Sequence, residues 1–178
     1  MNDTLAIAAT YNNLATLYKN KNNYLKALEY LEQSRTLLEK ANDASQLAAC
    51  YNNLGILYQS LKDNDKALEY YQKTLDMDIE SGDKHGQANA LNNIGTAYDD
   101  KGDKQKALEY YNRSLAINQE IEFEDGIATA LNNIGLIYLD LGDYDKSYTN
   151  LKNNADITRK ANDIHSIANN HNNLTKLF

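Results

Sequence analysis

The chain has 178 residues, a hydrophobic content of 42% and a formal net charge of −7. The apolar content argues against a disordered chain, and the negative charge argues against a nucleic-acid partner, whose phosphates attract a basic surface. The N-terminal stretch MNDTLAIAAT lacks the basic start and long apolar run of a signal peptide. No segment has the run of about 18 apolar residues that a membrane-spanning helix needs. We therefore expect a cytoplasmic protein without a membrane partner.

The sequence repeats with a period of 40 residues. Two adjacent asparagines mark each copy: YNNLATLY begins at Tyr11, YNNLGILY at Tyr51, LNNIGTAY at Leu91, LNNIGLIY at Leu131 and HNNLTKLF at His171. Such a period indicates an array of small structural units rather than a single globular core. Proline is absent, which favours a chain that is almost entirely helical.

Each unit contains two helical patterns, which the second unit illustrates with helices expected over about residues 44–61 and 64–81. Side chains that can cap a helix recur just before these patterns. The candidate caps are Asp3, Asp43, Asp83 and Asp163 for the first helices, and Asn23, Asp63, Asp103 and Asp143 for the second helices. Phe123 interrupts the first series, and we expect its cap to shift to Glu124 or Asp125.

Small residues at matched positions predict how the two helices of a unit pack. At about 100° per residue, Tyr51, Gly55 and Tyr58 share one apolar stripe. Glycine inside a helix costs about 1 kcal/mol relative to alanine, so we expect Gly55 to permit close approach of the paired helix. On that second helix, Ala67 is followed four residues later by Tyr71 on the same face. This pattern predicts antiparallel hairpins packed by interdigitation, and hairpins in series predict an α-solenoid.

These motifs resemble the tetratricopeptide repeat family. The resemblance rests on Leu54-Gly55-Tyr58, Lys62-Asp63 and Ala67-Leu68-Tyr71, and on NNIGTAYDDKGDKQKALEYY at 92–111. It implies an all-α, right-handed α-solenoid that forms one array over 1–178, with units at about 3–42, 43–82, 83–122 and 123–162 and a capping helix at 163–178. The usual repeat has about 34 residues, and the longer form is similar to repeats of kinesin light chain, spindle-orientation scaffolds and bacterial signalling regulators. Because the last copy lacks a second helix, we expect a fragment of a longer protein.

The asparagine pairs lie away from the packing stripe, since Asn52 and Asn53 stand about 100° and 200° from Tyr51. In tetratricopeptide arrays the first helices line a concave wall, so the resemblance assigns this face to a groove. The candidate partner-binding residues are Asn12, Asn13, Asn52, Asn53, Ile56, Asn89, Asn92, Asn93, Thr96, Asp99, Asn132, Asn133, Leu136 and Asp140.

Two interpretations of the asparagine pairs stay open. A carboxamide can donate and accept hydrogen bonds, so a row of them can hold the backbone of an extended peptide whatever its sequence. Alternatively, one asparagine of each pair bonds the backbone of the next repeat or faces water, and supports the register between repeats.

The charges predict which segments the groove prefers. Asp99, Asp100 and Asp140 fall on or near the concave face, whereas Lys19 and Lys176 lie towards its ends. Because no central basic cluster accompanies the carboxylates, we expect neutral or basic protein segments as partners. For the same reason we do not expect the family's lysine and arginine clamp on a C-terminal carboxylate.

The chain shows no motif for catalysis, a metal ion or a cofactor. His85, Asp125 and His165 occupy equivalent places in successive units, but neighbouring helices stand about 10 Å apart, too far for shared ligation. A polar rim of the groove is the favoured interpretation. Cys50 is expected to be a small core residue.

The predicted function is a protein-interaction scaffold, not an enzyme, that binds an extended peptide or partner segment in the groove. The alternative is a ligand-sensing input module of a larger signalling protein that carries a kinase, phosphatase or transcription-regulator domain. A monomer is expected, or a weak homo-oligomer through the exposed C-terminal end at Leu174, Leu177 and Phe178.

Overall fold

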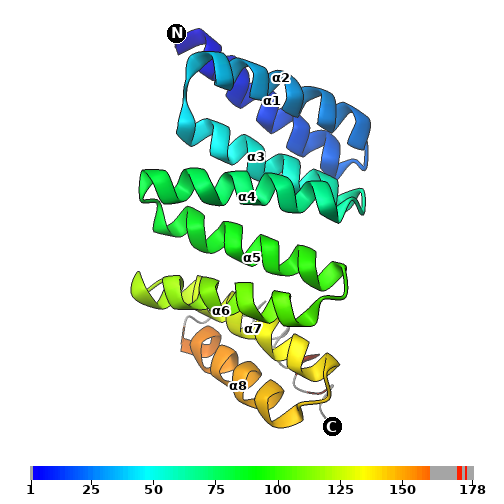
Figure 1. Ribbon diagram of the computed structural model, residues 1–178, viewed down its shortest axis with the longest axis vertical. Coiled ribbons are helices and arrows are strands. Elements are labelled where there is room, and N and C mark those ends of the chain that lie inside the picture. The colour runs from blue at the N-terminus through cyan, green and yellow to red at the C-terminus, as the bar shows by residue number, and fades with distance from the viewer. Residues whose placement is uncertain (1, 161–171, 174, 176–178) are drawn as a thin grey trace.

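Stacked helical hairpins make up the described part of the chain (Figure 1). The computed structural model describes residues 2–160, 172, 173 and 175. Residues 2–160 form α1 (Asn2–Asn20), α2 (Tyr24–Ala41), α3 (Ala44–Ser60), α4 (Asn64–Ser81), α5 (Lys84–Asp100), α6 (Lys104–Glu120), α7 (Glu124–Asp140) and α8 (Tyr144–Lys160). The all-α solenoid is confirmed, and the helices predicted for the second unit match α3 and α4. The expected capping helix at 163–178 lies largely outside the described residues.

Side-chain caps start most of these helices. Backbone amides three residues downstream donate to the predicted caps Asn23, Asp43, Asp63, Asp83, Asp103 and Asp143 at 2.9–3.3 Å. Two predictions are wrong. Asp3 lies within the first turn of α1, where its negative charge still complements the helix dipole. Phe123 itself occupies the cap position of α7 without a side-chain bond, so the cap does not shift to Glu124 or Asp125. Asp163 lies outside the described residues.

Left-handed residues end the helices at the same 40-residue period. Between the helices of a unit they are Asn22, Lys62, Gly102 and Gly142, and between units they are Asn42, Gly82 and Glu122. Glycine adopts this conformation without the steric cost that a Cβ imposes. The turns therefore keep one geometry even where lysine or glutamate stands in place of glycine.

The helices of a unit approach one another through glycine, as predicted. A Cβ added at Gly55 would lie 2.5 Å from Tyr71 Cε1, and one at Gly95 would lie 2.7 Å from Tyr111 Cδ1. Both distances are far below normal contact, and both tyrosine side chains are buried. The small residue of the first helix thus receives the bulky residue of the second, which closes each hairpin.

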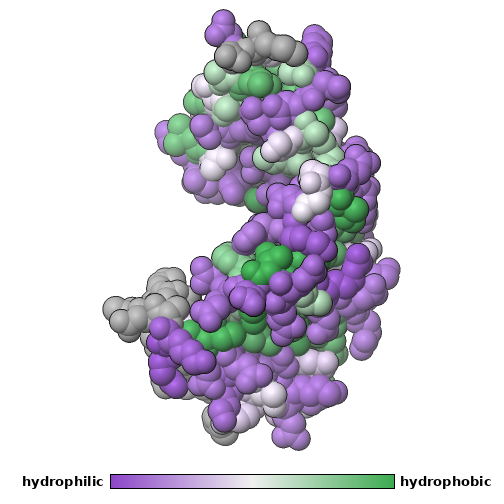
Figure 2. Space-filling model, turned by 90° about the vertical axis from the view of Figure 1, so that its left-hand side faces the viewer, coloured by the Kyte–Doolittle hydropathy of each residue, from purple (hydrophilic) through white to green (hydrophobic). Residues whose placement is uncertain are grey.

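Contacts between units bend the array towards its first helices. Each second helix packs against the next first helix, and consecutive first helices also touch, in the pairs α1 with α3, α3 with α5 and α5 with α7. The first helices therefore lie on the inner side of the curve. A space-filling view shows the molecule hollowed on one side (Figure 2). We call the surface between consecutive first helices, which carries the asparagine pairs, the inner groove.

Candidate functional site

All the predicted partner-binding residues remain accessible on the inner groove. Asn13, Asn89 and Asp140 are exposed, and the other predicted residues are half-buried. Several of them meet across neighbouring units, although they lie about 40 positions apart in the chain.

The asparagine pairs form a ladder of side-chain hydrogen bonds between consecutive first helices. Asn93 Nδ2 donates to Asn52 Oδ1, and Asn133 Nδ2 donates to Asn92 Oδ1, both at 2.9 Å. Asn173 repeats the contact with Asn132 at the same distance. In each case the second asparagine of one unit reaches the first asparagine of the unit before it. The structural interpretation of the pairs assumed a bond to backbone, whereas the partner is another side-chain amide.

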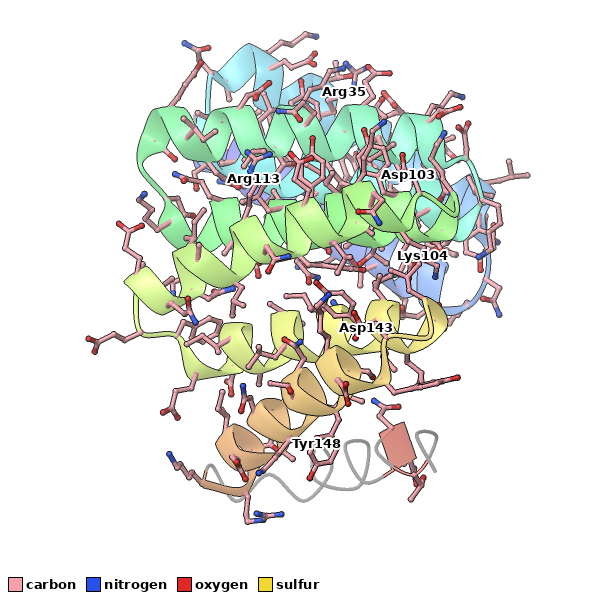
Figure 3. The ribbon with its side chains drawn as sticks, turned by 60° about the horizontal axis from the view of Figure 1, so that its bottom comes forward. Arg35, Asp103, Lys104, Arg113, Asp143 and Tyr148 are labelled. Atoms are coloured by element: carbon pink, nitrogen blue, oxygen red, sulfur yellow. The ribbon has the colours of Figure 1, made fainter. Side chains whose placement is uncertain are left out.

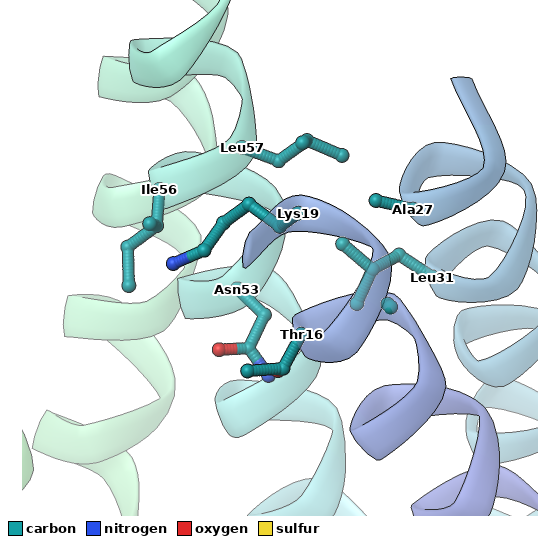
Figure 4. A pocket seen from close by; sticks show the side chains of 8 residues that line it. Thr16, Lys19, Ala27, Leu31, Asn53, Ile56 and Leu57 are labelled. Carbon is teal, nitrogen blue, oxygen red and sulfur yellow. The ribbon is translucent and has the colours of Figure 1, made fainter. Parts of the chain in front are cut away.

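The first junction does not follow this pattern. Asn12 Oδ1 is buried and has no hydrogen-bond partner among the described residues. Asn53 points towards Thr16 beside Lys19 (Figure 4). A small cavity of about 10 Å³ separates α1 from α3 here, enough for at most one water molecule. The ladder therefore begins at the second unit.

The first two rungs of the ladder leave unused hydrogen-bonding groups. Asn52 Nδ2 and Asn93 Oδ1 make no hydrogen bond with another described residue, and both side chains are half-buried. An amide group carries two donor hydrogens and a carbonyl oxygen with two lone pairs. One rung thus presents a free donor and a free acceptor at a fixed separation, the pair of groups that a peptide backbone can satisfy.

A second set of contacts joins the C-terminal ends of the first helices with the same offset of 41 residues. Gln59 Nε2 donates to Asp100 Oδ2 at 2.7 Å, and the Tyr71 hydroxyl donates to Gln59 Oε1 at 2.8 Å. At the next junction the equivalent residues are Asp99 and Asp140, two carboxylates that would repel each other. This conflict explains why a cation is needed there.

Lys104, at the start of α6, supplies that cation (Figure 3). Its Nζ lies 2.5 Å from Asp99 Oδ1 and 2.6 Å from Asp140 Oδ2. Partial burial lowers the pKa of Lys104, but hydrogen bonds to Asp140 and Asp99 outweigh this effect and raise it. The expectation that the groove carboxylates lack a central basic partner is therefore wrong, because Lys104 offsets one of the negative charges.

Sequence reasoning missed Gln59 and Lys104. Gln59 had a usable signal, since it stands 41 positions before Asp100, the same offset that joins Asn52 to Asn93. Lys104 had no such signal, because it comes from a second helix and reaches the groove across the turn at residues 101–103.

The histidines and the cysteine that the sequence analysis considered as possible reactive or metal-binding residues are described next. The His85 ring packs edge-on against Phe123 with centroids 4.4 Å apart. Within residues 2–160, no group of three or more histidine, cysteine, aspartate or glutamate side chains is placed to hold a metal ion. Cys50 is a buried core residue, as predicted, and burial raises the pKa of its thiol to about 11. His165 lies outside the described residues. None of the helices in the described part of the chain is long and apolar enough to cross a membrane.

Solved structures share this fold at low sequence identity. Aspartyl phosphate phosphatase F from Bacillus subtilis matches with a TM-score of 0.90 and 19% identity, over 96% of this chain and 45% of that chain. A Rap protein complexed with Competence and Sporulation Factor matches with a TM-score of 0.88 and 18% identity, over 99% and 53%. TPR-like repeats of a Podosopora anserina protein described as a kinesin light chain match with a TM-score of 0.80 and 17% identity, over 99% and 87%.

The chain thus spans about half the length of the first two of these proteins. No curated protein is recognisably similar to it in sequence. Models of the tetratricopeptide repeat match residues 6–80, 51–120 and 128–153, which together cover most of the chain. The 40-residue hairpins, the glycine contacts and these matches agree, and the chain belongs to the tetratricopeptide repeat family.

Proposed function

We propose that this chain is a protein-interaction scaffold that binds an extended peptide, or an extended segment of a partner protein, along the inner groove. The family and the hollowed inner face favour a protein partner. The unused amide groups of the ladder are the observation that supports an extended peptide as the ligand. A peptide strand laid along the groove would accept from Asn52 Nδ2 and donate to Asn93 Oδ1, and would repeat both contacts at the next rung.

The ladder suits this role because it orients the amides before a ligand arrives. A hydrogen bond to one end of a carboxamide fixes the plane of its other end. Binding then loses less side-chain freedom than it would with unpaired asparagines. Such contacts bind the backbone of the ligand whatever its sequence. Preference for particular ligand sequences therefore has to come from neighbouring side chains such as Ile56 and Leu136.

The proposed charge preference remains for neutral or basic segments, in a weaker form than the sequence alone implies. Lys104 offsets one of the three carboxylates near the centre of the groove, and Asp100 is hydrogen-bonded to Gln59. The excess that remains is still negative. Complementary charge of this kind raises the association rate and fades as salt increases.

Selection from a displayed library of random peptides, followed by calorimetric titration of a selected peptide, tests the proposal. A second copy of that peptide should carry N-methyl groups on alternate backbone amides, which removes donors and keeps the side chains. We expect the methylated copy to bind about tenfold more weakly or worse. Equal affinity of the two copies, or failure to select any peptide, contradicts the proposed mode.

A second candidate function is an input module of a larger signalling protein. The matched Rap protein was solved in complex with Competence and Sporulation Factor, and a matched Pyrococcus horikoshii protein is a signal transduction ATPase with a tetratricopeptide repeat sensor. This chain covers 27% of that ATPase. The complete gene would decide the matter, because a kinase, phosphatase or transcription-regulator domain joined to the array supports this function.

A further inference from the structure

A polar cavity of about 200 Å³ opens beside the second rung of the ladder, the hydrogen bond between Asn92 and Asn133. Three helices line it: α5 with Asn89 and Asn92, α6 with Asn118, and α7 with Asp125 and Thr129. Its size is below that of pockets for drug-sized ligands and suits a single side chain. The cavity lies next to the asparagines that the proposed function assigns to the ligand backbone.

Asn118 gives this cavity a hydrogen-bond acceptor. Its side chain is 4% exposed, and its Nδ2 donates to Ser114 Oγ at 3.3 Å. Its Oδ1 accepts no hydrogen bond from the described residues. This carbonyl oxygen is therefore open to an N–H group that a ligand supplies from the cavity.

The residue at position 126 keeps the cavity open. A Cβ added at Gly126 would lie 2.2 Å from Asn118 Oδ1 and 2.7 Å from Phe123 Cδ1, so a side chain cannot occupy this place without movement. Phe123 stands where earlier units have a capping aspartate, and its ring forms an apolar wall. The His85 ring packs edge-on against that wall and fixes its orientation.

Two further lining groups, on α7, can accept hydrogen bonds. Asp125 contributes an exposed carboxylate at the rim. The Thr129 hydroxyl already donates to the Asp125 backbone carbonyl at 2.9 Å, which leaves its oxygen as an acceptor. Among the described residues, no lysine, arginine or histidine lines the cavity. The fitting ligand group is therefore rich in donors, positively charged and flat enough to lie against Phe123.

We infer that this cavity is a subsite for an arginine side chain of the bound peptide. A guanidinium group offers five N–H donors in a plane, which suits Asp125 and Asn118 Oδ1 together, and its face can lie on the Phe123 ring. A lysine ammonium offers fewer donors and no flat face. The inference rests on the proposed peptide-binding function and names one feature of the ligand.

The test titrates ¹⁵N-labelled protein with N-acetyl-arginine N-methylamide and follows the side-chain amide signal of Asn118 by NMR. The citrulline analogue serves as the uncharged probe. The test variant is Asp125→Asn, and Glu124→Gln is its matched control, since it removes the same charge one residue away and lies outside the cavity. Thermal unfolding confirms that both variants fold.

We expect a saturable shift with a Kd on the order of 1–10 mM, typical of a small fragment. Asp125→Asn should weaken binding about threefold or more, Glu124→Gln should change it little, and citrulline should bind more weakly than arginine. Absence of a saturable shift, equal effects of the two variants, or equal binding of citrulline overturns the inference. In the peptide selection, binders without a conserved arginine overturn only this subsite, whereas failure to select any binder overturns the proposed function.

Discussion

Asn93 of one unit donates a hydrogen bond of 2.9 Å to Asn52 of the unit before it. Each residue keeps one unused end of its amide, so the same pair of side chains can join two units and face a ligand. The structural and binding interpretations of the asparagine pairs are therefore compatible. Both can be measured separately, because the two roles use different atoms.

A double-mutant cycle on Asn52→Ala and Asn93→Ala measures the structural role. Each single change loses one hydrogen bond and gains up to about 0.7 kcal/mol of helix propensity. We expect a coupling free energy of about 0.5–1.5 kcal/mol between the two positions, from chemical unfolding of the single and double variants.

The same cycle at Asn12 and Asn53 is the control, because no hydrogen bond joins this pair. Its coupling energy should be close to zero. A coupling as large as that of Asn52 and Asn93 contradicts the assignment of the effect to the amide bond. So does a coupling of zero at both junctions.

The features that sequence predicted are those that depend on consecutive residues. A capping aspartate such as Asp63 bonds an amide three residues away, and the helix period alone places Gly55 on the packing stripe. These geometries follow from the backbone of a single helix. Helix positions and hairpins could therefore be predicted from the sequence.

The features that sequence missed depend on how one unit is displaced relative to the next. The sequence repeats every 40 residues, but facing side chains are 41 apart, because Asn92 meets the following unit whereas its neighbour Asn93 meets the preceding one. The cavity beside Asn118 likewise needs three helices in their final places. Phe123 was recognised as a missing cap, whereas its role as a cavity wall follows only from the fold.

Replacement of Gly95 by leucine should destabilise the array. The Cβ alone would lie 2.7 Å from Tyr111 Cδ1, so the hairpin has to open or the tyrosine has to leave its buried position. Overpacking costs about 1–3 kcal/mol, and the better helix propensity of leucine offsets up to about 1 kcal/mol. Chemical unfolding should show a net loss of stability.

Ala116→Leu on the exposed face of α6 is the control and should change stability by no more than about 0.5 kcal/mol. An unchanged or raised unfolding midpoint for the Gly95 variant contradicts the close contact.

Stability should depend on pH through Asp78. Its carboxyl group lies against Gly86, and burial, together with the negative charge of Asp83, raises its pKa to about 6. Between pH 4 and 6 the folded chain therefore binds more protons than the unfolded chain, which titrates near pH 3.8. This residue favours folding below that window, and its stabilising effect is lost as the pH rises through about 6.

Asp78→Asn removes the titrating group. It also gives position 78 the same residue that the next unit has at the equivalent position, Asn118. We expect the variant to be more stable than the parent chain at pH 7 and to lose the slope between pH 4 and 6. Unfolding measured across this range checks the result. Asp76→Asn, an exposed change on the same helix, should keep the slope of the parent chain. A slope that survives in the Asp78 variant assigns the pH dependence to another group.

The variants Asn92→Asp and Asn133→Asp distinguish the contribution of the ladder to stability from its contribution to ligand binding. Asn92 accepts the hydrogen bond from Asn133, so Asn92→Asp keeps the acceptor oxygen and loses only the amide donors that face the groove. Asn133→Asp loses the donor of the rung and sets a carboxylate against a carbonyl oxygen. Each variant adds one negative charge, so each controls for the charge of the other.

Asn92→Asp should unfold within about 0.5 kcal/mol of the parent chain, whereas Asn133→Asp should lose about 1–3 kcal/mol because the acceptor of Asn92 is left without a donor. A library-selected peptide should bind Asn92→Asp about two- to tenfold more weakly in calorimetric titration, the worth of one net hydrogen bond. Titration at high salt, which screens the added charge, should preserve this loss. Unaltered binding by Asn92→Asp means that its amide does not contact the ligand. Equal destabilisation of the two variants means that Asn133 does not hold the units together through this bond.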